Sequence, residues 1–118
     1  MQLIKRKEYL KQLINWRDKK VIKVITGVRR CGKSTLMDLY KSCLLEQGVA
    51  NEQIISINFE DYDYIDLLEL RNFYAYVKER ILSDGRMTYC FFDEIQNVKD
   101  FERVVDSLYI KPNVDIYI

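Results

Sequence analysis

The sequence predicts an α/β fold built on a parallel sheet. Short β-rich runs alternate along the 118 residues with segments whose apolar positions recur at helical spacing. Parallel neighbours need a covering element between them, so this alternation favours right-handed crossovers. The length suits one compact domain with a single core, and we expect a single domain over residues 1–118.

The spacing of apolar residues predicts two helices and two strands in the first half of the chain. Apolar residues at helical spacing among charges indicate an amphipathic leading helix at about residues 5–19. A β-branched run at 21–26 fits a buried strand. A second helix is expected at 33–47, with Gly48 placed as the residue after its end. A second strand follows at 54–59 and leads into an acidic turn.

The second half predicts a long helix, two strands and a short helix between them. One apolar stripe runs through residues 64–82, which indicates a single helix. A third strand is expected at 87–92. An i, i+3, i+4, i+7 pattern then follows Asp100, a candidate N-cap, and Pro112 closes this helix. A fourth strand is expected at 114–118.

Composition narrows the class of protein. Hydrophobic residues make up 48% and charged residues 31%, which is typical of a packed soluble domain. The net charge of +1 supplies no overall field for nucleic acid or an anionic membrane, and no apolar run approaches the roughly 20 residues of a transmembrane helix. Three cysteines without a CxxC pair indicate reduced thiols in a cytoplasmic protein, and the absence of histidine removes the usual zinc sites.

Residues 27–34 carry the pattern G-x-x-x-x-G-K-S between a predicted strand and a predicted helix. Such a P-loop binds nucleotide phosphates through backbone N–H groups and the helix N-terminus. Lys33 is expected to bridge the β and γ phosphates, Ser34 to be a ligand of Mg²⁺, and Thr35 to reach the α-phosphate. The alternative is a glycine turn with an incidental lysine. The expected nucleotide-binding set is Gly27, Val28, Arg29, Arg30, Cys31, Gly32, Lys33, Ser34 and Thr35.

An apolar run at residues 89–92 ends in two carboxylates, Asp93 and Glu94, in the form of a Walker B strand. Because parallel strands place their loops at one edge of the sheet, Asp93 is expected to reach the metal held by Ser34. Glu94 is the candidate base that orients the attacking water. The alternative is a solvated strand end. The Asp-Glu pair, in place of the D-x-x-G of GTPases, favours ATP over GTP.

The chain resembles bacterial and archaeal AAA-superfamily ATPases of the AAA_14 type, whose P-loop domain precedes a C-terminal domain of unknown function. The resemblance rests on IKVITGVRRCGKSTL at 22–36, INFED at 57–61 and FFDEIQNV at 91–98. It implies a three-layer P-loop fold of the ASCE/AAA-like type with sheet order 5-1-4-3-2. It also implies ATP hydrolysis coupled to conformational change, with catalytic roles for Lys33 and Glu94 and metal ligation by Ser34 and Asp93.

The resemblance also predicts that this chain is an N-terminal fragment, with strands 1 to 4 present and strand 5, sensor and arginine finger elsewhere. The missing C-terminal domain is then an expected partner, and the unpaired edge at 21–26 favours self-association. A second function stays open, a nucleotide-sensing regulatory or interaction module that binds ATP with little turnover. Asn58 is a candidate hydrogen-bond partner of Glu94, and the alternative for it is a turn cap.

Overall fold

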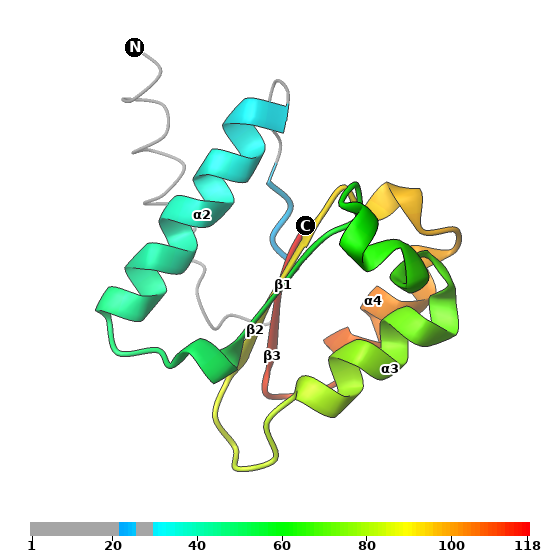
Figure 1. Ribbon diagram of the computed structural model, residues 1–118. Helices are drawn as coiled ribbons and strands as arrows, with labels where there is room; N and C mark the ends of the chain where they lie inside the picture. The colour runs from blue at the N-terminus through cyan, green and yellow to red at the C-terminus, as the bar shows by residue number, and fades with distance from the viewer. Residues whose placement is uncertain (1–21, 26–29) are drawn as a thin grey trace.

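The computed structural model describes residues 22–25 and 30–118, with side chains described for 22–25 and from residue 36 onward. The expected leading helix at 5–19 and three residues of the P-loop pattern, Gly27, Val28 and Arg29, lie outside the described residues. Strands alternate with helices in the described part, which confirms the α/β class (Figure 1).

Three parallel strands form the sheet in the order β1 (Ile54–Asn58), β2 (Thr88–Asp93) and β3 (Val114–Tyr117). The apolar runs therefore predicted these three strands to within one residue at each end. The one shift that matters for the site is in β2, where the strand pairing continues through Asp93.

The strand predicted at 21–26, which would be the fourth member of this sheet, is not confirmed. Residues 22–25 lie beside β3 but are joined to it by one parallel bridge, between Lys23 and Tyr117. The Lys23 N–H donates to the Ile116 carbonyl at 2.9 Å, and the Ile118 N–H donates to the Lys23 carbonyl at 2.9 Å. The Ile25 N–H also donates to the Ile118 carbonyl at 2.6 Å, so the described residues 22–25 continue alongside the end of β3. The complete order 5-1-4-3-2 stays a prediction.

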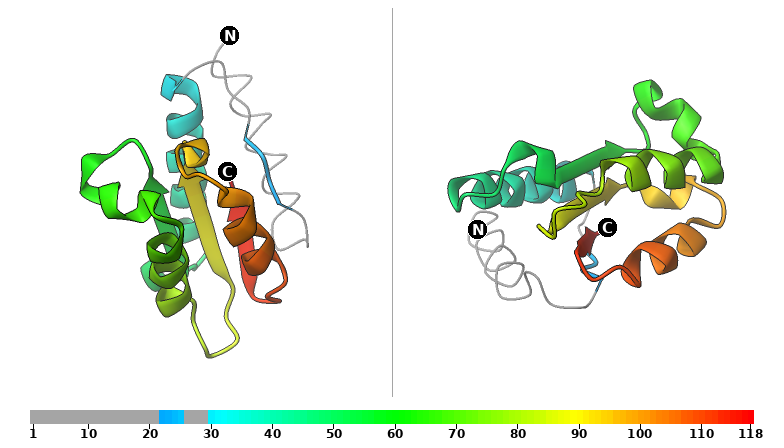
Figure 2. Two further views of the ribbon diagram at one scale, coloured as in Figure 1. Left: turned by 90° about the vertical axis from the view of Figure 1, so that its right-hand side faces the viewer. Right: turned by 90° about the horizontal axis from the view of Figure 1, so that it is seen from below.

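Helices cover both faces of the sheet. In Figures 1 and 2, α2 (Arg30–Glu46) lies on one side, and α3 (Leu70–Arg80) and α4 (Phe101–Tyr109) lie on the other. Successive side chains of a strand point to opposite faces, so each strand serves two cores. The core under α2 includes Tyr89, Phe91 and Tyr117. The core under α3 and α4 includes Cys90, Phe92 and Ile116.

The single helix predicted at 64–82 is wrong, because the structure has a 3-10 segment, η2 (Tyr62–Leu68), followed by α3. Glu69 between them is extended, with φ −80° and ψ 126°, and its carboxylate accepts a hydrogen bond from the Asn72 N–H at 3.1 Å. The Asn72 side-chain amide donates to the Asp66 carbonyl at 3.0 Å. These local bonds satisfy the backbone at a helix start, so a new helix begins here.

The start of α2 and the capping of α4 also differ from the prediction. Helix α2 begins at Arg30 and not at Lys33, so the backbone of the second half of the P-loop pattern is helical. Asp100 occupies the N-cap position of α4 but makes no side-chain cap, because its backbone is left-handed with φ 62°. The prediction for Gly48 is confirmed, since it follows α2 with φ 97°, a conformation that suits glycine.

Candidate functional site

Asp93 ends the central strand β2 in a buried position, with 8% of its surface exposed. Asn58, the last residue of β1, lies opposite it in the register. One residue further along, the Phe59 N–H donates to the Asp93 carbonyl at 3.0 Å. Strand pairing therefore fixes the backbone of Asp93 from the β1 side, where the apolar run of β2 meets its first carboxylate.

Glu94 turns the chain sharply after β2. Its backbone is left-handed, with φ 57° and ψ 41°, which is uncommon for a residue other than glycine, asparagine or aspartate. Two donors of Asn97, the backbone N–H at 3.2 Å and the side-chain amide at 3.0 Å, hold the Glu94 carbonyl. The Glu94 carboxylate accepts a hydrogen bond from the Gln96 side chain. Left-handed residues of this kind gather at functional sites, where surrounding bonds hold them in place.

Asn58 was a candidate hydrogen-bond partner of Glu94, but its side chain caps the turn after β1. The Asn58 side-chain oxygen accepts from the Glu60 N–H at 3.0 Å, and the Asp61 carboxylate accepts from the Asp63 N–H at 3.0 Å. Two successive side-chain caps of this type close the acidic turn after β1. The turn-cap interpretation of Asn58 is therefore the correct one.

The segments on both sides of the P-loop pattern lie near the Asp93 end of the sheet. Residues 22–25 run parallel to β3, which runs parallel to β2, so the chain leaves Ile25 toward the edge at which Asp93 lies. The amino end of α2 lies at the same edge in Figure 1. Residues Arg30 to Thr35, including Lys33 and Ser34, form the first turns of α2.

A polar network that the sequence did not predict is buried beneath α2. The Lys23 ammonium forms an ion pair with one Asp115 oxygen, the Tyr117 hydroxyl donates to the other at 2.9 Å, and the Tyr40 and Tyr117 hydroxyls are 2.9 Å apart. We call these side chains the buried polar network: Lys23, Tyr40, Asp115 and Tyr117. Burial and the nearby Asp115 carboxylate raise the pKa of the Tyr117 hydroxyl, so it stays protonated and donates.

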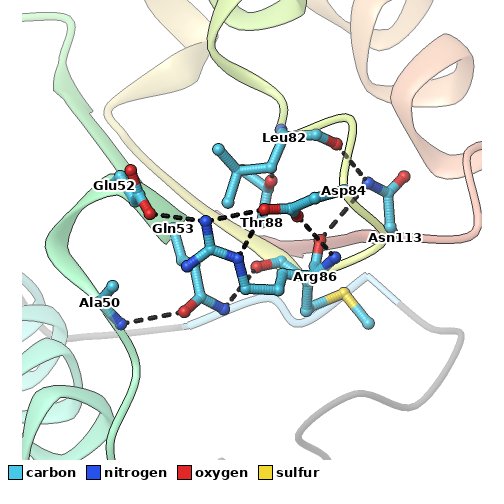
Figure 3. A network of polar contacts seen from close by, with 9 residues as sticks. Ala50, Glu52, Gln53, Leu82, Asp84, Arg86, Thr88 and Asn113 are labelled. Atoms are coloured by element: carbon cyan, nitrogen blue, oxygen red, sulfur yellow. Dashed lines mark hydrogen bonds and ion pairs between the residues drawn. The ribbon is translucent and has the colours of Figure 1, made fainter.

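A second network ties the amino ends of the three strands together (Figure 3). Asp93 lies at the other end of β2. Arg86, ahead of β2, pairs with Glu52 at 2.6 Å and with Asp84 at 2.8 Å. The Gln53 amide donates to the Met87 carbonyl at 3.0 Å. The Asn113 amide, ahead of β3, donates to the Leu82 carbonyl at 2.9 Å and the Arg86 carbonyl at 3.4 Å. We call this set the distal network.

Two kinds of feature are absent from residues 22–25 and 30–118. No helix in these ranges is long and apolar enough to cross a membrane. No group of three or more histidine, cysteine, aspartate or glutamate residues gathers in them as a metal site.

A parallel sheet between helical layers, with a carboxylate at the buried end of its central strand, is typical of nucleotide-binding ATPase-like domains. The chain belongs to such a family, because a family model described as an AAA domain matches residues 19–118. The chain is also 40% identical over 116 residues to an uncharacterized protein of Haemophilus influenzae. That alignment covers 98% of this chain and 29% of the relative. No solved structure matched.

Proposed function

We propose that this chain binds ATP with Mg²⁺ as the P-loop domain of an AAA-type ATPase, and that hydrolysis drives a conformational change. One observation carries the proposal. The buried strand β2 ends in Asp93 and Glu94 at the edge of the sheet where the chain enters and leaves the G-x-x-x-x-G-K-S run. This is the relative placement that joint recognition of phosphate and metal requires.

The phosphates would be held by residues 27–35. Backbone N–H groups of the loop and of the first turn of α2 suit anionic oxygens, and Lys33 supplies a cation for the β and γ phosphates. The Arg29 and Arg30 guanidinium groups are suited either to phosphate or to a partner subunit. ATP is favoured over GTP because the chain has Asp93-Glu94 where GTPases carry D-x-x-G.

The donor set at this edge fits a magnesium ion. Mg²⁺ in nucleotide sites is held by one or two protein oxygens together with phosphate oxygens and water, so a cluster of carboxylates is not required. Asp93 offers a carboxylate at a buried strand end, and the Ser34 hydroxyl is its proposed counterpart. When bound, the ion would neutralise charge on the phosphates. Asp93 would help to hold it at the end of β2.

Glu94 is the proposed group that orients and deprotonates the attacking water. Its fixed backbone aims the side chain from the turn directly after Asp93. In this structure its carboxylate accepts a hydrogen bond from Gln96, which favours a second function for the chain. If Gln96 keeps Glu94 from water, ATP is bound and sensed with little turnover. The rate of phosphate release decides between the two.

The remaining length of a protein such as the Haemophilus influenzae relative would supply further partners of this domain. We propose a C-terminal domain of the same protein and self-association as these partners. Light scattering with and without ATP would detect a change in subunit number.

Calorimetric titration with ATP and with GTP, each with and without Mg²⁺, tests the proposal. We expect saturable, Mg-dependent ATP binding that Lys33→Ala abolishes and Glu94→Gln preserves. Lys41→Ala is the matched control, because Lys41 lies on the same helix and contacts Ser56 at 2.8 Å and Asp38 at 3.1 Å. Equal loss of binding in both lysine variants would show that general charge, and not the P-loop lysine, holds the nucleotide.

A further inference from the structure

The buried polar network joins the two segments that flank the P-loop pattern. Lys23 lies four residues before Gly27, and Tyr40 lies six residues after Ser34. Both reach the same strand, because Lys23 pairs with Asp115 and Tyr40 meets the Tyr117 hydroxyl. The chain entering the loop and the helix leaving it are therefore fixed to neighbouring positions of β3.

These contacts specify one arrangement of the two segments. The side chains of Lys23 and Asp115 are 4% and 1% exposed, so an unpaired charge at either position would be costly. Each Asp115 oxygen has a described donor, the Lys23 ammonium or the Tyr117 hydroxyl. The hydrophobic effect is non-directional, whereas hydrogen bonds lose strength steeply with distance and angle. In some proteins, buried polar groups of this kind contribute more to a unique structure than to stability.

We propose that the buried polar network positions the P-loop for nucleotide binding by fixing the distance between the segments on its two sides. The proposal rests on the proposed nucleotide site. Tyr40 and Tyr117 are then positioning residues, which act on the nucleotide through the backbone of the loop and not by touching it.

Tyr40→Phe is the most selective test, because it removes one hydroxyl and keeps the ring. The ring lies 5.0 Å from that of Tyr117 and 6.0 Å from that of Phe91, contacts that phenylalanine retains. We expect ATP to bind about five-fold more weakly, equivalent to about 1 kcal/mol, the net value of one buried hydrogen bond. Tyr117→Phe removes two hydrogen bonds, and we expect a larger loss of affinity.

Thr88→Val is the control for a loss of stability alone. The fully buried Thr88 hydroxyl accepts from the Leu82 N–H at 3.3 Å, at the opposite end of the sheet from Asp93. A bond that only stabilises the fold leaves nearly all molecules folded and competent, so the dissociation constant does not change. Tyr40→Phe and Thr88→Val should therefore lower the melting temperature similarly, and only Tyr40→Phe should weaken ATP binding.

Amide hydrogen exchange of the nucleotide-free protein gives a second measurement that needs no ligand. Peptides covering residues 26–35 should exchange faster in Tyr40→Phe than in Thr88→Val. Wild-type affinity in Tyr40→Phe, with Lys33→Ala inactive in the same titration, would overturn the positioning role and leave the proposed function standing. If the wild-type protein does not bind ATP, the proposed function fails, and equal exchange in the two variants then overturns the positioning role as well.

Discussion

Replacing Glu94 by glycine should make the protein more stable and less active. Glu94 has a left-handed backbone, φ 57° and ψ 41°, which costs an L-residue about 1–2 kcal/mol. Glycine avoids this cost but loses about 0.5–1 kcal/mol more in backbone entropy on folding. The net gain lies between about 0 and 1.5 kcal/mol, and its central value of about 0.75 kcal/mol corresponds to roughly 2–5 °C in melting temperature for a domain of this size.

Asp100→Gly is the matched variant. Asp100 is exposed, has φ 62° and makes no side-chain cap, so glycine there should give a gain of the same sign. Glu94→Gly and Asp100→Gly should differ in ATP hydrolysis, because only Glu94 is proposed to orient the attacking water. Glu94→Gln keeps the backbone strain, and we expect unchanged stability with lost hydrolysis.

Urea unfolding and phosphate release measure the two effects separately. Loss of stability in Glu94→Gly beside a gain in Asp100→Gly would refute the reasoning about strain. It would mean that the side chain of Glu94, through its bond with Gln96, contributes more than the backbone conformation costs. Full hydrolysis by Glu94→Gly would refute its role as the base.

Three further outcomes test the core, the thiols and the distal network. Phe73→Ala should cost about 3–5 kcal/mol in urea unfolding, because Phe73 is fully buried and packs edge-on against two rings at 4.9 and 5.0 Å; a cost below about 1 kcal/mol would contradict this packing. Burial raises the pKa of the Cys90 thiol, so peptide mapping after treatment with a thiol reagent should show Cys43 modified and Cys90 unmodified until the protein unfolds. Hydrogen bonds from Arg86 lower the pKa of the Asp84 carboxyl, so this pair stabilises the fold above the ordinary pKa of about 4 and is lost as pH falls below it. The melting temperature of Asp84→Asn should therefore fall less than that of the wild-type protein between about pH 5 and pH 3. If the melting temperatures of the two proteins fall in parallel with pH, the pair does not contribute to stability.

The strands were predictable because a strand that is buried on both faces is a continuous run of apolar residues in the sequence. Every residue of β2 is buried, and its run of apolar residues identifies it without knowledge of its neighbours. The carboxylate at its end was predictable for the same reason, since Asp93 directly follows that run. The helix break at Glu69 was not, because the apolar stripe continues across it while two local side-chain bonds end the first segment.

The buried polar network was not predictable from spacing. Asp115 lies 92 residues from Lys23, and in a β-rich run one aspartate is normally read as solvent-facing. Its burial follows from the sheet order, which brings residues 22–25 beside β3 and places α2 above both. Only the alternation of Asp115 and Tyr117 on one face of the strand could have suggested that they share an environment.

The distal network fixes how the three strands enter the sheet. Arg86, Gln53 and Asn113 link the connections ahead of all three strands, so relative movement of the strands is restrained there. Separating the strands at this end would first break the Arg86 ion pairs and the hydrogen bonds of Gln53 and Asn113. The spacing of the strands is therefore set by side chains that lie at the opposite end of β2 from Asp93.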